Sequence, residues 1–500
     1  MIDVVLIHPS PYKRDIYAKV KAIDNLPIAI WYLGSYLKSE GFSVMLIDFE
    51  SDSNALDKLA SAGKNARLIA ITMMTAQVSH GLEIAKFIKE KIGNIPIVVG
   101  GVHSTLYPTE TVKSKYIDFT VQGEGEIVLF ELISAIKENK QNYSKIGGLS
   151  YKVNDKAFFN KVKNKFVDHL NYPDLDYALL GGKRASLALV TSRGCPYDCA
   201  FCCNKVIEER TTFKTWSLNK IMREVKKALG LGIGDIFFWD DNFFQKKQRL
   251  LSFLEEIKKL DKKFTWFGNA RADYFNERYI SVELLSELNR NGLTRVSIGA
   301  ESGSQRMLDY MQKGIKVDHI LRAAEYCVKA NIAPSFSFMT GLPNENPEDV
   351  DLTVRCIKKL CHILPLPKIL GPALYLPLPG SKMFHDCERY GYRAPRTIED
   401  WATIDSGYGF SAYDRPWIKN PDMVRIVWFY SILIGISFKK LIKLMKRYSE
   451  LSGYSKAKKL TLVILAVIGS LIGKMRYRFR FFKFPVEAII FKKFRIMNAQ

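Results

Sequence analysis

Four cysteines crowd into nine consecutive positions of the 500-residue chain, within the segment RGCPYDCAFCC. Cys195, Cys199 and Cys202 follow the spacing CxxxCxxC. Three thiolates can bind three irons of a four-iron cubane cluster, which leaves the fourth iron open to a ligand that is not protein. The spacing therefore predicts a 4Fe-4S cluster with these three cysteines as its metal ligands.

Zinc is the competing metal for such a segment. Structural zinc requires four ligands, commonly two cysteine pairs, and no second pair follows downstream. Cys203 is a poor fourth ligand because adjacent cysteines reach one metal only with strain. A zinc-stabilised nucleic-acid-binding protein with a basic tail is thus a remote alternative, and iron and sulfide analysis of anaerobically purified protein distinguishes it from a cluster protein.

The amino-terminal part of the chain has the pattern of a parallel α/β sheet. Hydrophobic residues make up 47% of the whole sequence and charged residues 25%, the balance of a globular protein of several domains. Within residues 1–142, β-branched runs that predict strands at 4–8, 43–48, 68–72, 95–99 and 117–121 alternate with amphipathic stretches. Polar or glycine-rich turns begin at His8, Thr72, Gly100 and Gln122. Such turns line a ligand crevice at the carboxyl ends of parallel strands.

A second series of the same kind follows a connector. Residues 143–183 lack helical periodicity and are expected to contain a short hairpin. Residues 184–390 then contain six strand patterns, at 186–192, 235–239, 264–271, 295–301, 334–340 and 369–376, with helical patterns between them. Six βα repeats predict a partial barrel, and the cysteine segment follows its first strand, where barrels place their reactive groups.

The carboxyl-terminal region, residues 391–500, is aromatic and then basic. From Lys439 to Gln500 there are 16 Lys and Arg against two Glu, a net charge of +14 out of +23 for the chain. Its apolar runs at 426–438 and 460–473 are shorter than the ~20 residues that span a bilayer. We expect helices in peripheral contact with a membrane, because long apolar runs contribute little to nucleic-acid binding. Helices packed on the barrel with their basic faces in water are the alternative.

Segments beyond the cysteines resemble those of the radical S-adenosylmethionine (radical SAM) enzymes, in their cobalamin-dependent branch. They are FWDDNFF from Phe238, IGAESGSQRMLDYMQKG from Ile298, TGLPNENPED from Thr340 and YLPLPGSKMF from Tyr375. The resemblance implies a flavodoxin/Rossmann-like cobalamin-binding domain, then a partial (β/α)6 TIM-like radical SAM barrel, then a mostly helical basic region. It also implies that S-adenosylmethionine (SAM) binds the open iron and is cleaved to a 5′-deoxyadenosyl radical.

The same resemblance implies a set of cofactor-binding residues. Around SAM these are Phe201, Asp240, Asp241, Arg271, Glu301 and Gly341, and around cobalamin Thr72, Thr75, Gly100, Gly101, His103, Ser104, Gly123 and Glu124. Helix capping by the two aspartates and an ion pair between Arg271 and Asp273 are the structural alternatives. No histidine is expected on cobalt, because the chain contains no Asp-x-His-x-x-Gly loop.

The expected enzyme uses the cluster, SAM and cobalamin to functionalise an unactivated carbon by methyl transfer. Ring formation or rearrangement without methyl transfer is the alternative, and no catalytic side chain is assigned. The tRNA methylthiotransferases share the barrel but need three further cysteines, and residues 1–194 contain none. Expected partners are a small-molecule or lipid-linked substrate and a flavodoxin- or ferredoxin-type reductant, and nucleic acid is not an expected partner. The first residues lack a secretory pattern, so a cytoplasmic location, with membrane association through the tail, is expected.

Overall fold

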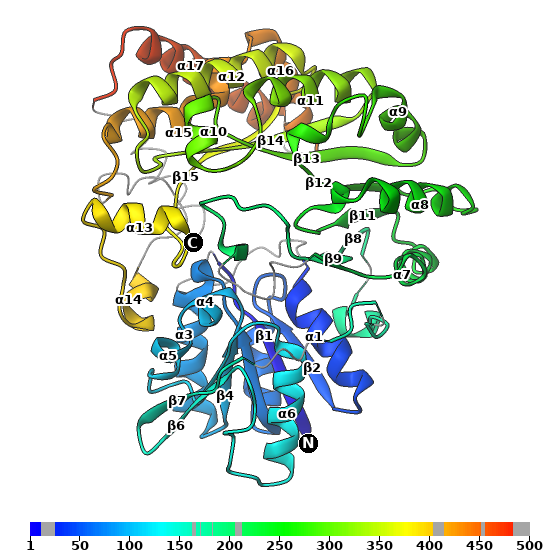
Figure 1. The fold of residues 1–500 in the computed structure, drawn as a ribbon, viewed down its shortest axis with the longest axis vertical. Coiled ribbons are helices and arrows are strands. Elements are labelled where there is room, and N and C mark those ends of the chain that lie inside the picture. Colours follow the sequence, from blue (N-terminus) through cyan, green and yellow to red (C-terminus); the bar gives the residue numbers. More distant parts are fainter. Residues whose placement is uncertain are drawn as a thin grey trace.

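The computed structural model describes residues 1–11, 26–162, 167–170, 172–182, 184–205, 213–403, 415–451 and 456–483. Two α/β units follow one another along the long axis of the molecule, and the helices of the last part of the chain lie at the far end of the second unit (Figure 1).

The first unit is built on a seven-stranded sheet in the order β2-β1-β3-β4-β5-β6-β7. Its strands are β1 (Ile2–His8), β2 (Val44–Asp48), β3 (Ala66–Thr72), β4 (Ile97–Gly100), β5 (Phe119–Val121), β6 (Leu149–Val153) and β7 (Lys156–Phe159). The first five are parallel, in the flavodoxin-like order 2-1-3-4-5. All five predicted strands are present. The hairpin β6–β7 pairs antiparallel with β5, so it extends this sheet and does not belong to the connector as predicted.

Helices cover both faces of this sheet. Helices α1 (Ile28–Ser39) and α6 (Gly125–Lys137) pack on one face, and α2 (Ala55–Gly63) and α3 (Val78–Phe87) pack on the other. The short helices η2 (Ile88–Ile92), α4 (Val102–Leu106) and α5 (Pro108–Val112) complete the unit. Four successive residues of β1, from Val4 to Ile7, are fully buried. A strand that is covered on both faces requires this continuous apolar run, which is why the sequence predicted it correctly.

The second unit is a sheet of six parallel strands in the order β15-β14-β13-β12-β11-β8. The strands are β8 (Ser186–Leu189), β11 (Asp235–Phe238), β12 (Thr265–Ala270), β13 (Leu293–Glu301), β14 (Ala333–Thr340) and β15 (Lys368–Leu374). They alternate with α7 (Leu218–Gly230), α8 (Lys247–Lys258), α9 (Val282–Arg290), α10 (Gln305–Tyr310), α11 (Val317–Lys329) and α12 (Pro347–Ile363). The first and last strands do not pair, so the predicted partial (β/α)6 barrel is confirmed.

Serine side chains define where several of the barrel helices begin. Ser217, Ser281 and Ser304 accept hydrogen bonds from the backbone N–H groups of Lys220, Leu284 and Met307. A serine in this position satisfies a donor that the first helical turn leaves unpaired. The helices therefore start immediately after the strand-to-helix turns, which keeps those turns short at the carboxyl edge of the barrel.

The two units share one hydrophobic core. Trp31 and Tyr32 of α1 belong to the same buried cluster as the barrel helices and strands. The Trp31 Nε1–H donates to the Asp176 carbonyl at 2.9 Å, and the backbone N–H of Val190, just after β8, donates to the Tyr32 hydroxyl at 2.7 Å. This shared core fixes the carboxyl edge of the first sheet against the segment that follows the first barrel strand.

The region after the barrel is divided between the two units. Helices α13 (Lys382–Arg389), α15 (Pro421–Gly435), α16 (Phe438–Leu451) and α17 (Lys456–Arg478) belong to the barrel end, whereas α14 (Ile398–Thr403) returns to the first unit. There the Trp401 ring lies 5.6 Å from the His103 ring, centroid to centroid. Among the described residues no helix combines the length and the apolar character that a membrane crossing requires.

Candidate active site at the cysteine loop

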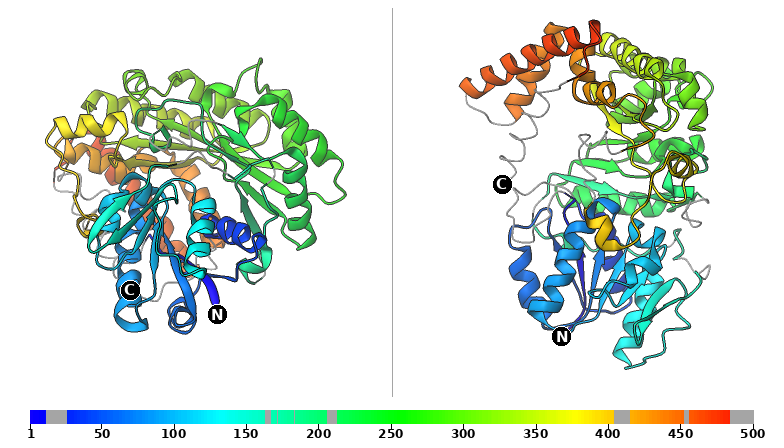
Figure 2. Two further views of the ribbon diagram at one scale, coloured as in Figure 1. Left: turned by 60° about the horizontal axis from the view of Figure 1, so that its bottom comes forward. Right: turned by 90° about the vertical axis from the view of Figure 1, so that its left-hand side faces the viewer.

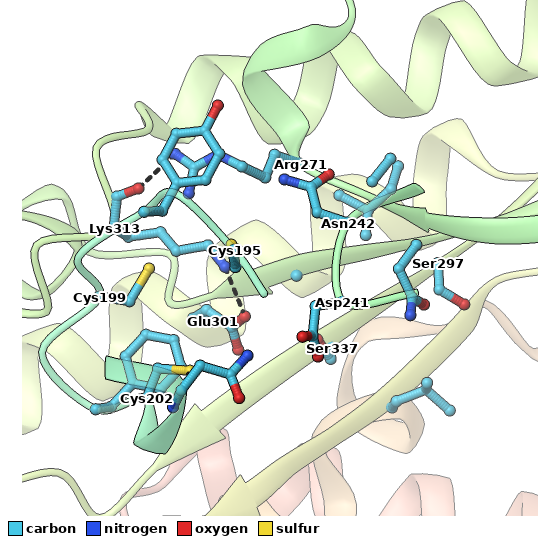
Figure 3. A pocket seen from close by; sticks show the side chains of 18 of the residues that line it. Cys195, Cys199, Cys202, Asp241, Asn242, Arg271, Ser297, Glu301, Lys313 and Ser337 are labelled. Carbon is cyan, nitrogen blue, oxygen red and sulfur yellow. Dashed lines mark hydrogen bonds and ion pairs between the residues drawn. The ribbon is translucent and has the colours of Figure 1, made fainter. Parts of the chain in front are cut away.

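The cysteine loop opens into a cavity of about 270 Å³ at the carboxyl ends of the barrel strands. Its lining consists of the three predicted ligands, Cys195, Cys199 and Cys202, with Tyr197, Phe201, Asn204, Asp241, Asn242, Asn269, Ala270, Arg271, Ser297, Ile298, Gly299, Glu301, Lys313, Ser335, Ser337 and Leu370. Figure 3 shows the three cysteines on one side of this cavity, with Asp241, Asn242, Ser297 and Ser337 across from them.

Backbone hydrogen bonds hold the middle of the cysteine loop in place. The Ala200 N–H donates to the Met311 carbonyl at 2.8 Å, and the Ala200 carbonyl accepts from the Met383 N–H at 3.1 Å. The Cys202 N–H donates to the Cys199 carbonyl at 3.0 Å, which closes a tight turn. The loop is thus anchored to segments more than a hundred residues away, and its three thiols are positioned before any metal binds.

The state of these thiols agrees with metal ligation. All eight cysteines are free thiols. Burial raises the pKa of Cys202 to about 12 and raises that of Cys195 as well, so both are protonated at neutral pH without metal. Metal binding must displace these protons, because the thiolate is the ligand. Cys203 does not line the cavity, in keeping with its exclusion from the predicted ligand set.

The arrangement suits a cluster better than a single ion. Within the described part of the chain, no three His, Cys, Asp or Glu side chains lie close enough to share one metal ion. Zinc needs its sulfur ligands at ~2.3 Å from a common centre, whereas each thiolate of a cubane cluster binds a different iron. Three thiols around one cavity, each able to bind its own iron, are therefore compatible with a 4Fe-4S cluster.

A buried ion pair lies beside the cysteines in the cavity wall (Figure 3). Lys313 Nζ lies 3.0 Å from Glu301 Oε1, and the two side chains are only 10% and 11% exposed. The ammonium also lies 5.7 Å from the centre of the Phe201 ring. Burial lowers the pKa of Lys313, but the adjacent Glu301 carboxylate more than offsets this and the net pKa is raised. A permanent cation therefore lies in the cavity wall beside the cysteine loop (Figure 3).

The close packing of this pair restricts the neighbouring backbone. A Cβ at Gly299 would lie 2.4 Å from Glu301 Oε1 and 2.9 Å from Lys313 Nζ. Glu301 itself has a φ of +63°, a left-handed conformation that is unusual for a residue with a side chain. Because Gly299 has no side chain and Glu301 has a left-handed backbone conformation, the Glu301 carboxylate can fold back over its own strand. Glu301 therefore contacts Lys313 at the cavity wall. Its contact with SAM stays a prediction.

Arg271 forms the ion pair with Asp273 that was the alternative to a cofactor contact, and it also lies in the cavity wall. It lines the cavity, and its Nε donates to Asp273 Oδ1 at 3.0 Å. One Nη donates to the Lys313 carbonyl at 2.6 Å, and the guanidinium lies 3.6 Å from the centre of the Tyr197 ring. Arg271 is thus tied to the cysteine loop through Tyr197 and to the ion pair through Lys313, which makes it a positioning residue at the cavity wall.

The two adjacent aspartates have different roles. Asp241 lines the cavity, and its neighbour Asn242 has a buried Oδ1 without a hydrogen-bond partner among the described groups. An unsatisfied buried acceptor at a cavity wall is the signature of a polar ligand site. Asp240 is fully buried outside the lining, so its predicted contact with SAM is not supported. Its carboxylate accepts from the Thr191 N–H at 2.6 Å and from the Ser192 hydroxyl at 2.6 Å, which fixes the entry to the cysteine loop.

Gly341 also lies outside the cavity lining. Its φ is +69°, its N–H donates to Glu345 Oε2 at 2.6 Å, and its carbonyl accepts from Trp417 Nε1 at 2.8 Å. These bonds use both backbone groups of Gly341 in a turn that Glu345 holds in shape. The contact of Gly341 with the cofactor stays a prediction.

Because Glu345 is ionisable and buried, its contribution to the stability of the protein is expected to depend on pH. Burial raises its pKa from 4.5 to about 7. Between these values the folded protein holds a proton that the unfolded chain has lost, so the stabilisation is complete at acid pH and is lost as the pH rises. The free energy of unfolding of the wild type, relative to Glu345→Gln, is expected to fall by about 3 kcal/mol from pH 4 to pH 8. Urea unfolding at several pH values measures this, and parallel profiles for the two proteins would refute it.

The cobalamin crevice is expected at the β1/β3 switch point of the first sheet, where the strand order reverses. Thr72 and Thr75 are partly exposed there, and Met74 between them is 49% exposed. His8 is held beneath them by Asp48 at 2.9 Å and by Gln77 at 2.8 Å. This turn therefore offers both polar and apolar side chains at the predicted crevice. His8 contacts Asp48 and Gln77, and the absence of a histidine ligand on cobalt stays a prediction.

Four other residues predicted for this crevice have structural roles. Gly100 ends β4, and a Cβ at Gly101 would lie 2.8 Å from the Met73 carbonyl, so this glycine allows two turns to approach closely. His103 is fully buried beside Trp401, and burial lowers its pKa to about 4. The Ser104 hydroxyl donates to the Val121 carbonyl at 3.0 Å. The predicted contacts of His103 and Ser104 with cobalamin are therefore not supported.

The turn after β5 also forms a hydrogen bond and ion pairs with other parts of the protein. The Gly123 N–H donates to the Thr105 hydroxyl at 3.1 Å. Glu124 lies 3.2 Å from His169 Nε2 and 3.4 Å from Arg193, at the junction of the two units. The switch point lies two strands away, between β1 and β3. Gly123 thus has a partner within the first unit, and Glu124 lies at the interface between the two units. The contact of both residues with cobalamin stays a prediction.

Several cavity residues were not predicted, and the sequence carried signals for some of them. Lys313 lies in the segment IGAESGSQRMLDYMQKG, whose resemblance was noted without this residue. Ser297, Ser335 and Ser337 are small polar residues at alternate positions of β13 and β14, which is the pattern of an inward face. Asn242 lies in FWDDNFF and Tyr197 in the cysteine segment, two segments that were noted without these residues. Asn204, Asn269 and Leu370 carried no recognisable signal.

Comparison with known proteins identifies the class. The Radical SAM superfamily profile matches residues 189–357, and the B12 binding domain profile matches residues 15–133. The chain therefore belongs to the cobalamin-binding radical SAM enzymes. The radical SAM domain implies a 4Fe-4S cluster and SAM, and the B12 binding domain implies cobalamin. Both matched ranges lie within the predicted domains.

Two relatives and one solved structure show which members of this class the chain is similar to. An uncharacterized methyltransferase of Pyrococcus horikoshii is 29% identical over 378 residues, which are 72% of this chain and 78% of the relative. The anaerobic magnesium-protoporphyrin IX monomethyl ester cyclase of Rubrivivax gelatinosus is 24% identical over 78% of this chain and 73% of its own. The solved structure of the radical SAM methyltransferase TsrM from Kitasatospora setae matches 78% of this chain and 76% of its own, with a TM-score of 0.63 and 21% identity, and shows the same fold.

Proposed function

We propose that this enzyme transfers a methyl group to an unactivated carbon of a small-molecule or lipid-linked substrate. The observation that carries the proposal is the direct junction between the cysteine loop and the carboxyl edge of the cobalamin-binding sheet. Arg193 immediately precedes the loop, and its guanidinium lies 2.7 Å from Glu126 and 3.4 Å from Glu124. Methyl transfer from one cofactor site to a radical formed at another requires this kind of fixed proximity.

The junction is strong because it is buried. Glu126 and His169 are 4% and 6% exposed, and the Tyr172 hydroxyl donates to Glu126 at 3.1 Å. Burial alone would raise the pKa of Glu124, but the hydrogen bond from His169 and the charge of Arg193 lower it to about 2. The Glu124 carboxylate therefore stays ionised beside the guanidinium, and the contacts of Arg193 with Glu124 and Glu126 link the two domains at the base of the cysteine loop.

The cofactors would supply the reactive groups, and the protein would bind and orient them. When bound, the cluster and SAM supply a hydrogen-abstracting radical and cobalamin supplies a methyl group. Cys195, Cys199 and Cys202 hold the metal, and Lys313 and the orphaned Asn242 Oδ1 offer a cation and an acceptor to the amino acid part of SAM. The seryl hydroxyls of β13 and β14 and Leu370 of β15 line the remaining wall, where they limit water and orient the bound molecules.

Ring formation without methyl transfer is the less favoured alternative. The relative with higher identity, at 29%, is named a methyltransferase, and the cyclase relative is 24% identical. Both reactions require the same cofactors, so the cofactor residues do not separate them. An external one-electron donor of the flavodoxin or ferredoxin type is proposed for either reaction.

Isotope labelling tests the reaction. Cells expressing the wild type or Cys199→Ala are grown anaerobically with cobalamin and methyl-deuterated methionine, and their lipids and metabolites are compared by mass spectrometry. We expect at least one compound that carries an intact labelled methyl group only with the wild type. A wild-type product that lost hydrogen or closed a ring without label would contradict methyl transfer and support the alternative.

A further inference from the structure

Helix α17 presents an apolar face to solvent. Six of its large apolar side chains are between 46% and 62% exposed; they are Leu460, Ile464, Leu465, Ile468, Leu471 and Met475. At 3.6 residues per turn these six positions fall within an arc of about 140°. We call this set the α17 apolar face. Scattered exposed apolar residues are normal on a protein, but a continuous helical stripe of this kind marks an interaction surface.

The opposite side of α17 is packed, so the orientation of the apolar face is fixed. Ser470 is fully buried, and its hydroxyl donates to the Leu433 carbonyl of α15 at 2.8 Å. A Cβ at Gly473 would lie 2.7 Å from the Tyr430 ring, so the two helices approach as closely as a glycine permits. Because α17 already has its partner on this side, the outward stripe does not reflect a missing contact with the barrel.

Cations border the apolar face. By the same helical geometry Arg478 lies at one edge of the arc and Arg476 lies just beyond the other. Helix α16 packs beside α17 and exposes Lys439, Lys443 and Lys446. The segment from Lys439 to Gln500 carries a net charge of +14. The surface is therefore apolar in the centre and strongly positive around it.

The apolar side chains of the α17 apolar face and the positive charge around it together favour one kind of binding partner. A second copy of this chain would bring two strongly positive tails together, which electrostatic repulsion opposes. Nucleic acid would complement the cations but would leave the apolar stripe in water. An anionic bilayer accepts both, because apolar side chains enter the acyl boundary while arginine and lysine pair with headgroups. We propose that the α17 apolar face docks this enzyme on the surface of an anionic lipid bilayer.

The location of this surface suits an enzyme that takes its substrate from the membrane. In Figure 2 (right), α16 and α17, orange to red, project beyond the barrel at the end farthest from the amino-terminal unit. Helix α15 links α17 to the barrel edge, where the Ser431 hydroxyl donates to the Gly371 carbonyl of β15 at 3.0 Å. The adjacent Leu370 lines the cavity. Docking adds a location to the proposed reaction and does not depend on methyl transfer.

Vesicle binding tests the docking. The full chain, reconstituted with its cluster, is sedimented with vesicles of phosphatidylglycerol and phosphatidylcholine or of phosphatidylcholine alone. The variant is Leu465→Gln/Ile468→Gln/Leu471→Gln. The matched control is Val153→Gln/Phe158→Gln/Phe159→Gln, which alters side chains of the β6–β7 hairpin that are 46%, 44% and 46% exposed. We expect the α17 variant to bind anionic vesicles about 10-fold or more weaker than wild type, and the control to bind as wild type does.

Several results would overturn the docking. They are equal binding by the α17 variant and wild type, absence of wild-type binding to anionic vesicles, and self-association through α17 by sedimentation velocity in place of vesicle binding. Arg478→Glu provides a second variant should the triple change impair folding, since Arg478 is exposed, and it is expected to weaken binding to anionic vesicles selectively. Failure of methyl transfer would leave these binding results unchanged, so the two proposals can fail separately.

Discussion

Replacing Cys199 by Ala is expected to abolish the iron-sulfur cluster and to reduce SAM cleavage to background. Each of the three cavity cysteines binds a different iron, so the loss of one leaves two of four irons without a protein ligand. The anchors of the loop at Ala200 remain, so the fold is expected to persist. Iron and sulfide analysis should fall from about four irons per chain in the wild type, and the visible absorbance that bleaches on reduction should disappear.

The adjacent cysteine supplies the matched control. Cys203 is next to Cys202 in sequence but lies outside the cavity lining, so Cys203→Ala is expected to retain the cluster and its spectrum. Cys195→Ala and Cys202→Ala should behave as Cys199→Ala does. A cluster that survives in one of these three variants and is lost in Cys203→Ala would show that the ligand assignment is wrong.

The strands could be predicted because their sequence pattern follows from local physics. Strands buried on both faces need continuous apolar runs, as β1 shows, and all eleven parallel strands coincide with the strand patterns predicted from the sequence. The hairpin at β6 and β7 was assigned to the connector because its place in the sheet depends on pairing with β5, a non-local contact. The return of α14 to the first unit depends similarly on Trp401 meeting His103, nearly 300 residues earlier.

The type of residue at the end of a strand predicts a functional site. The direction in which its side chain points, however, depends on partners that are distant in the sequence. Asp240 and Asp241 are chemically identical neighbours, yet only Asp241 lines the cavity, because Thr191 and Ser192 capture the other carboxylate. Glu124 follows β5 at the predicted edge, yet it pairs with His169 and Arg193 in the domain junction. These partners come from other elements, so a single sequence contains no signal that separates the two cases.

Replacing Lys313 by Met is expected to lower both the stability of the protein and its affinity for SAM. The substitution removes the partner of Glu301, a carboxylate that is 9% exposed and held in place by its positive φ. An uncompensated buried charge of this kind costs about 3–5 kcal/mol. The lost ammonium also removes the cation that lies beside the cysteine loop, so the carboxylate of SAM loses a partner. Urea unfolding measures the first effect and calorimetric titration of the reconstituted protein with SAM measures the second.

A double variant separates the two effects. In Lys313→Met/Glu301→Gln the buried carboxylate is replaced by a neutral amide, so much of the lost stability should return, because no unpaired charge remains. SAM affinity should stay low, since the cation is still absent. Lys316→Met, on the exposed side of the same turn, is the matched control and should change the free energy of unfolding by less than about 0.5 kcal/mol. Restoration of SAM affinity in the double variant would show that Lys313 acts only as the structural partner of Glu301.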